Sequence, residues 1–280
     1  MKNALNYDLH CHSTGSDGLL APRDLVRRAV ERGVDVLALT DHDNLGGLQE
    51  AAAAANELGL HFVSGVEIST SWNDITIHIV GLGIDAANVT LTQGLAAVRN
   101  SRGRRAERIA AGLEEAGVPN ALRGALAFCE DPSLISRTHF ARYLVSVGHT
   151  ADVKSVFQHY LTPGKPGYVA HDWASIADAV NWIRSAGGQA VVAHPGRYKL
   201  NPLEMNRLLG EFKDAGGVGI EVVTGSHSPE QYGEYALRAR EFGFLASRGS
   251  DFHGPGETRL DLGQLPPLPA DLRPIWHQGL

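Results

Sequence analysis

The apolar and polar positions of the chain form two alternating kinds of segment. Short, nearly continuous apolar runs, such as residues 34–40 (VDVLALT), are typical of strands buried on both faces. Longer segments with helical spacing lie between them, and residues 22–33 begin with proline and end at glycine, as helices often do. The predicted strands are residues 5–10, 34–40, 61–67, 75–81, 189–194, 218–223 and 244–247. The predicted helices between them are residues 22–33, 45–59, 175–187, 202–215 and 229–243.

This alternation predicts an α/β protein with a mainly parallel sheet. Polar clusters follow many of the strands, which favours a distorted (β/α)7 barrel over an open sheet. Residues 100–165 interrupt the pattern with several short helices, predicted at 104–116, 121–129, 138–147 and 152–161. We expect residues 1–99 and 166–280 to build the barrel and the inserted helices to form a cap beside its mouth. The proline-rich tail from Leu265 is expected to run over the surface.

Composition narrows the choice of partners. The chain has 280 residues, of which 43% are hydrophobic and 20% charged, so it can bury a sizeable core. A net charge of −6 argues against duplex DNA but leaves room for a small anionic substrate held by local charges. Two cysteines, Cys11 and Cys129, and the lack of a long apolar run favour a cytoplasmic protein without a membrane partner. Nothing in the pattern predicts an obligate protein partner.

The first polar cluster is His10-Cys11-His12, at the end of the first predicted strand. Residues i and i+2 of a strand point to the same side, so both imidazoles could bind one metal ion. Asp17 follows in the next loop. A lone His-x-His pair is weak evidence for a metal site, and the case depends on further clusters.

The second cluster is Thr40-Asp41-His42-Asp43, directly after a buried strand, where barrel active sites form. Capping of the following helix is an alternative explanation for Asp43 or Asn44. Capping does not explain His42.

Four further positions extend the pattern. Glu67 ends a strand, and its carboxylate could bridge two metal ions. His78 lies within a strand, where a hydrogen-bonded core histidine is the alternative. His194 follows another strand in the motif AHPGR, and Asp251 and His253 follow the last strand. Such clusters at successive strand ends together predict a metal centre.

These motifs, in the order HxH, TDHD, strand-end Glu, in-strand His, AHP and SDFH, resemble the PHP (polymerase and histidinol phosphatase) family over nearly the whole chain. The stretches 136–142 (SRTHFAR) and 160–165 (YLTPGK) resemble a subgroup with nucleoside 3′,5′-bisphosphate phosphatases and 5′→3′ exoribonucleases. The resemblance implies three divalent metal ions. The first set of ligands would be His10, His12, Glu67 and Asp251, the second Glu67, His78 and His194, and the third Asp17, His42 and His253.

Mixed nitrogen and oxygen ligands suit Mn²⁺, Fe²⁺ or Zn²⁺ rather than Ca²⁺, and the family favours manganese. We hypothesise that a hydroxide bridging two of the ions attacks phosphorus. Asp41 is expected to orient the neighbouring ligand His42. The neighbourhood of His194 is one candidate source of the proton for the leaving group, and a metal-bound water is another.

A bisphosphate substrate would need a second anion site, for which arginine is well suited. Arg197, close to His194, and the cap residues Arg137 and His139 are the main candidates. The full candidate substrate-binding set is Ser136, Arg137, His139, Arg197, Arg102, Arg105 and Tyr168. A solvated helix face is an equal alternative for Arg102 and Arg105, and Tyr168 would stack on a base. Arg142 is expected to be structural.

The function expected from the resemblance is removal of the 3′-phosphate from nucleoside 3′,5′-bisphosphates, such as 3′,5′-bisphosphoadenosine. Three alternatives remain open: an exoribonuclease acting on short RNA 5′ ends, a histidinol-phosphate phosphatase, and a non-catalytic domain stabilised by metal. The helical insertion with its arginines disfavours the histidinol phosphatase, because a small amino alcohol needs no second anion pocket.

Overall fold

A computed structural model describes residues 5–170 and 173–280 of the chain. Within these residues the strands form one eight-stranded sheet in the order β1-β2-β3-β4-β6-β7-β8, and β5 pairs with β3. The sheet nearly closes on itself, because the amide of Leu9 donates to the carbonyl oxygen of Arg248 at 3.1 Å and Cys11 pairs with Phe252. The distorted barrel is therefore confirmed. The strands are β1 (Tyr7–Asp8), β2 (Val36–Leu39), β3 (His61–Trp72), β4 (Ile75–Leu82), β5 (Ala174–Ser175), β6 (Gln189–Val192), β7 (Gly219–Thr224) and β8 (Leu245–Gly249).

Strand β4 is the antiparallel member of the barrel and pairs in that sense with both β3 and β6. It follows β3 through a tight turn in which Asn73 and Asp74 adopt φ values of 45° and 62°. These residue types tolerate the left-handed conformation that a two-residue hairpin turn needs. Strand β3 extends to Trp72, beyond its predicted end at residue 67. The hairpin sets His78 opposite Ser69, two residues beyond Glu67.

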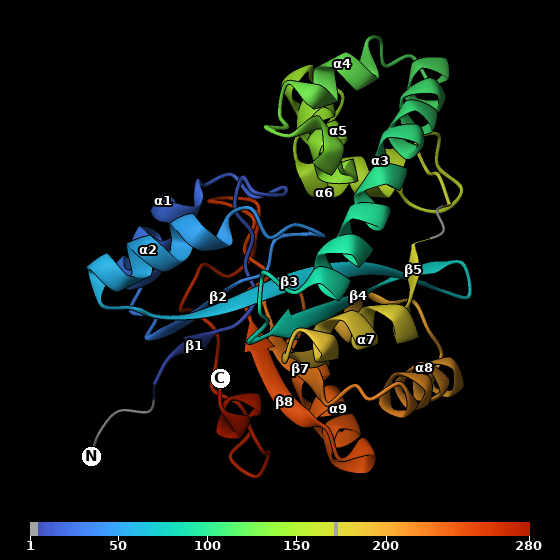
Figure 1. Cartoon of the computed structure of the whole chain (residues 1–280). Coiled ribbons are helices and arrows are strands. Elements are labelled where there is room, and N and C mark those ends of the chain that lie inside the picture. The colour runs from blue at the N-terminus through green and yellow to red at the C-terminus, as the bar shows by residue number, and fades with distance from the viewer. Residues whose placement is uncertain (1–4, 171–172) are drawn as a thin grey trace.

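Five helices cover the outside of the barrel, with α1 and α2 on one side and α7, α8 and α9 on the other (Figure 1). They are α1 (Pro22–Glu31), α2 (Leu48–Leu58), α7 (Ile176–Ser185), α8 (Pro202–Asp214) and α9 (Pro229–Phe242). Side chains of each strand alternate between the barrel interior and these helices. In β2, Leu37 and Leu39 pack in the cluster with the helices, whereas Val36 and Ala38 pack in the interior.

The inserted helices stand over one end of the sheet (Figure 1). They are α3 (Val89–Glu115), α4 (Ala121–Leu126), α5 (Arg137–Ser146) and α6 (Val153–Val156), with a 3₁₀ turn η1 (Pro132–Leu134) and a π-helical turn η2 (Phe157–Leu161). We call this segment the cap. It has its own hydrophobic cluster, which includes Leu113, Phe140 and Leu161.

Helix α3 begins well before the helix predicted at 104–116 and runs across residue 100. Gly94 and Gly103 weaken the helical signal there. Gly94 is needed for packing, because a Cβ at this position would lie 2.4 Å from the Trp182 ring. The division of the chain at residues 100 and 165 stays a prediction.

The C-terminal tail does more than cross the surface, which corrects the expectation for it. Ile275 is fully buried in the barrel interior beside Leu245, and Trp276 stacks on Tyr7 with 4.0 Å between ring centroids. The tail thus closes the end of the barrel at which β1 and β8 begin. Among residues 5–170 and 173–280, no helix has the length and apolar composition to cross a membrane.

Candidate metal centre

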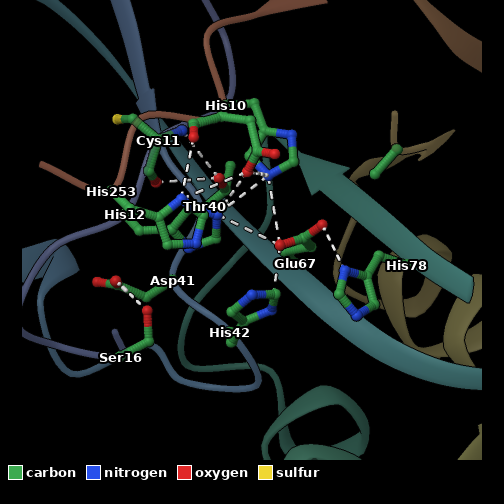
Figure 2. A network of polar contacts seen from close by, with 12 residues as sticks. His10, Cys11, His12, Ser16, Thr40, Asp41, His42, Glu67, His78 and His253 are labelled. Atoms are coloured by element: carbon green, nitrogen blue, oxygen red, sulfur yellow. Dashed lines mark hydrogen bonds and ion pairs between the residues drawn. The ribbon is translucent and has the colours of Figure 1, made fainter. Parts of the chain in front are cut away.

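The ionisable side chains predicted at the strand ends converge at the mouth of the barrel, around Glu67 (Figure 2). Each comes from a strand or from the loop that follows it. They are His10, His12 and Asp17 after β1, His42 after β2, Glu67 in β3, His78 in β4, His194 after β6, and Asp251 and His253 after β8.

Cluster one contains His10, His12, Glu67 and Asp251, the set predicted for the first ion. The Nε2 atoms of His10 and His12 each lie 3.3 Å from Glu67 Oε2. Asp251 Oδ1 lies 3.6 Å from His10 Nε2 and 3.4 Å from His12 Nε2. All four side chains are buried.

Cluster two surrounds the carboxylate of Glu67. His78 Nδ1 and His194 Nε2 each lie 2.9 Å from Glu67 Oε1, as the predicted second set requires. His42 Nδ1 lies 3.0 Å from Glu67 Oε2, so His42 also joins this group, which the sequence interpretation did not include. Figure 2 shows Glu67 between His10, His42 and His78.

Cluster three contains Asp17, His42 and His253, as predicted, together with His12. Asp17 Oδ1 lies 3.5 Å from His253 Nε2 and 3.9 Å from His42 Nε2. Clusters one and three share His12, clusters one and two share Glu67, and clusters two and three share His42. The three groups therefore form one continuous centre.

The donor atoms fit divalent cations. Asp17 Oδ1, Glu67 Oε2 and Asp251 Oδ1 are buried oxygens without a hydrogen-bond partner among the described residues. A buried carboxylate oxygen left unpaired costs free energy unless another cationic or donor group satisfies it. Each of these oxygens faces imidazole nitrogens, and such a mixed set suits first-row transition metals.

Burial and charge set the protonation of the imidazoles. Burial, followed by the positive charge of Arg197, lowers the pKa of His194 to about 3, so its ring is neutral and available as a ligand. Burial also opposes a proton on His12, but the carboxylates of Asp251 and Glu67 outweigh it and raise the pKa of His12 to about 10. A metal ion at His12 must therefore displace a proton.

Glu221 is a supporting residue that sequence reasoning missed. It lies in β7, and its buried carboxylate accepts hydrogen bonds from His10 Nδ1 at 2.8 Å and from the His194 amide at 2.6 Å. One carboxylate thus orients a residue of cluster one and a residue of cluster two. The signal in the sequence was a single acidic residue within the apolar strand VGIEVV.

Asp41 was expected to orient His42, but its recorded hydrogen bonds go to Ser13 and Ser16 instead, and Asp43 likewise holds a neighbouring segment. The Asp41 carboxylate accepts from the hydroxyls of Ser13 and Ser16 at 2.5 and 2.6 Å and so holds the loop that leads to Asp17. The Asp43 carboxylate accepts from Ser69 and forms an ion pair with Arg102. Helix α2 begins at Leu48 with Gly47 as its N-cap, so capping by Asp43 or Asn44 was the wrong alternative.

Four arginines line a cavity beside the centre, together with His42, His78 and His253. Two of them are neutralised: Arg102 by Asp43, and Arg197 by Asp251 Oδ2 at 2.9 Å. The other two, Arg105 and Arg137, have no carboxylate partner among residues 5–170 and 173–280. The structure thus brings Arg102 and Arg105 into the site, whereas the alternative placed them on a solvated face.

Burial and, after it, neighbouring positive charges act on Arg105 and Arg137. Burial and the neighbouring charges of Arg137 and Arg102 lower the pKa of Arg105 to about 9, and burial and Arg197 lower that of Arg137 to about 10. Both guanidinium groups stay charged at neutral pH, and each therefore keeps a buried positive charge beside other positive charges. A bound anion would offset these charges.

The remaining candidates lie at different distances from the cavity. Ser136 lines it, and its hydroxyl donates to Asp17 Oδ2 at 3.0 Å. His139 is buried instead, and its Nδ1 accepts from the Ser136 amide in a capping box of α5. Tyr168 does not line the cavity. Two aromatic residues that the sequence reading passed over do: Trp173, with Arg102 and Arg105 over its ring at 5.0 and 5.3 Å, and Phe157.

Comparisons with known proteins agree with this geometry. A 3′,5′-nucleoside bisphosphate phosphatase from Chromobacterium violaceum is 53% identical over 273 residues, covering 98% of this chain and 96% of that protein. A 5′-3′ exoribonuclease from Haemophilus influenzae is 42% identical over 272 residues, covering 97% of this chain and 98% of the relative. The solved structure of a Chromobacterium violaceum amidohydrolase with bound sulfate and no metal superposes with a TM-score of 0.95 at 53% identity, covering 98% of this chain and 95% of that one. The PHP domain family matches residues 8–222, and the chain therefore belongs to the PHP domain family.

Proposed function

We propose that the protein is a metal-dependent phosphomonoesterase that removes the 3′-phosphate from nucleoside 3′,5′-bisphosphates. The observation that carries this proposal is a pair of arginines, Arg105 and Arg137, which have no carboxylate partner among the described residues and line the same cavity as His42, His78 and His253. A substrate with two phosphates can place one at the centre and the other against these cations. The relative from Chromobacterium violaceum, which is named for this activity, supports the same substrate.

The residues of the centre have two roles in this proposal, binding metal ions and orienting the residues that bind them. Clusters one, two and three would hold three divalent ions, most simply Mn²⁺, with Fe²⁺ and Zn²⁺ as alternatives. Such ions supply a nucleophile at neutral pH and neutralise phosphoryl charge. Glu67 joins clusters one and two, and Glu221 fixes the orientation of His10.

His194 acts as a ligand and not as the proton donor in this proposal, because its pKa near 3 leaves the ring without the extra proton that an acid must carry. Arg197 was expected to hold the second phosphate, but because it is paired with Asp251 of cluster one this proposal assigns it to the reacting phosphoryl group instead. Arg105 and Arg137 bind the phosphate that stays on the product.

A second candidate is hydrolysis of short RNA from its 5′ end, which the Haemophilus influenzae relative supports. The same arginines would then bind the terminal 5′-phosphate. The cytoplasmic location and the absence of an obligate protein partner stay predictions.

A panel of substrates tests the proposal, with release of inorganic phosphate measured for the small substrates and release of nucleoside 5′-monophosphates measured for RNA. The panel contains adenosine 3′,5′-bisphosphate, the matching 3′-monophosphate, histidinol phosphate and short RNA with a 5′-phosphate, each with Mn²⁺. We expect the highest kcat/KM for the bisphosphate. A preference for histidinol phosphate, or no phosphate release from any substrate, would refute the proposal, and preference for the RNA would select the second candidate.

A further inference from the structure

Asp17 is the residue of cluster three to which the cap donates hydrogen bonds among residues 5–170 and 173–280. Its side chain is 3% exposed. Oδ1 faces His42 and His253, whereas Oδ2 accepts a hydrogen bond from Ser136 Oγ at 3.0 Å. Ser136 is the N-cap of α5, and its hydroxyl oxygen also accepts from the amide of Thr138 at 3.1 Å. The hydroxyl proton is therefore directed to Asp17.

A second contact holds the backbone of Asp17. Arg142, also in α5 and 6% exposed, donates from Nη2 to the Asp17 carbonyl oxygen at 2.6 Å. The same guanidinium binds both carboxylate oxygens of Glu257 at 2.8 and 2.7 Å. Arg142 thus joins the loop after β1, which carries Asp17, to the loop after β8, which carries His253.

Cluster one has a different support. Its four residues lie in or directly after barrel strands, and Glu221 of β7 holds His10. Arg197, in the loop after β6, holds Asp251. Loosening α5 should therefore disturb Asp17 and leave the residues of cluster one in place.

We propose that Ser136 and Arg142 of α5 position Asp17, so that docking of the cap on the barrel and binding of a metal ion at cluster three stabilise each other. The inference rests on the proposed three-ion centre. Coupling of two binding events is reciprocal, so a metal ion that holds Asp17 must also hold α5 against the barrel. Filling of the centre would then place the cap arginine Arg137 over the cavity.

Titration of the full-length protein with Mn²⁺ alone tests the proposal, with bound metal measured after dialysis. The variants are Ser136→Ala and Arg142→Gln. Tyr143→Phe is the matched control, because Tyr143 is also in α5 but its hydroxyl donates to Pro119 within the cap. We expect both variants to weaken one of three equivalents about 10- to 100-fold, as expected for loss of a buried charge-assisted hydrogen bond. The other two equivalents, and the control, should match the wild type.

Hydrogen exchange of the α5 amides with and without Mn²⁺ distinguishes coupling between metal and cap from a purely structural role of Ser136 and Arg142. Mn²⁺ should slow exchange of the α5 amides in the wild type and in Tyr143→Phe, and this protection should be lost in Ser136→Ala and in Asp17→Asn. Equal weakening of all equivalents, unchanged binding in both variants, or α5 exchange that ignores Mn²⁺ would overturn the proposal. The proposal would also be overturned if the wild type bound only two equivalents of Mn²⁺ and Asp17→Asn bound the same two. No substrate is used, so a wild type that couples metal to α5 but releases no phosphate would refute the proposed function alone.

Discussion

Replacement of Arg137 by alanine should reveal which phosphate the cap recognises. Arg137 lines the cavity and lies over the ring of Phe157 with 5.6 Å from guanidinium carbon to centroid. Its recorded hydrogen bond is a long one, 3.4 Å to the carbonyl oxygen of Leu161, and it has no carboxylate partner among the described residues. Its charge is thus available to an anion, and removing it leaves no buried carboxylate unpaired.

The size of the expected effect on kcat/KM follows from the contact that Arg137 would make with the phosphate. A charge-assisted hydrogen bond contributes about 1.5–3 kcal/mol, so kcat/KM for a 3′,5′-bisphosphate should fall about 10- to 100-fold. The matching 3′-monophosphate lacks the second phosphate, so its kcat/KM should change little in Arg137→Ala. Arg197 should behave differently, because it is paired with Asp251 of cluster one. Arg197→Ala should lower kcat/KM for both substrates to a similar degree.

The assay is a double cycle of phosphate release: wild type and Arg137→Ala, each with the bisphosphate and the 3′-monophosphate. Arg104→Ala is the control for charge. Arg104 is also a cap arginine, in α3, but it is exposed and does not line the cavity. It should change neither rate by more than about twofold, as expected of a screened surface charge. Equal losses on both substrates in Arg137→Ala would refute the assignment of Arg137 to the phosphate that is not cleaved.

Three further predictions concern the metal centre. His42→Ala and Asp251→Asn should each lower kcat by orders of magnitude, because the ligands work as a unit, and near wild-type phosphate release in either variant would contradict the assignment. Removal of metal with a chelator should abolish activity and lower the Tm, both restored by Mn²⁺, and an active protein in which elemental analysis finds no metal would contradict the proposed centre. The raised pKa of His12, about 10, means that its proton is bound below that pH and must leave when metal binds. Despite burial, the carboxylates of Glu221, Glu67 and Asp251 also raise the pKa of His10, so Mn²⁺ affinity should fall by at least about tenfold for each pH unit from 8 to 6. Calorimetry in buffers of different ionisation enthalpy should show proton release, and affinity independent of pH would refute this.

Much of the centre was predictable from short stretches of sequence. His10 and His12 point the same way because side chains in a strand repeat every two residues, and both indeed reach Glu67. His42 follows the end of an apolar strand, a place where polar side chains meet in a barrel, whereas Glu67 follows an apolar run but lies within the longer β3. The helices at 22–33, 202–215 and 229–243 could be predicted because proline and glycine mark their ends locally.

What the sequence by itself determined, then, is seven of the eight strands, all but the two-residue β5, together with the outer helices and the donor residues, since each depends on neighbours a few positions away. Tertiary structure alone decided how these residues are paired. His10 meets Glu221 across 211 positions, and Arg142 meets Asp17 across 125. Tertiary structure likewise decided which arginines are ion-paired. Arg102 pairs with Asp43, 59 positions away, whereas Arg105, three residues further along α3, has no carboxylate partner in the part of the chain that the structure describes. Such contacts depend on how the barrel closes and where the cap docks, and no local periodicity encodes the distance between segments that are remote in the chain.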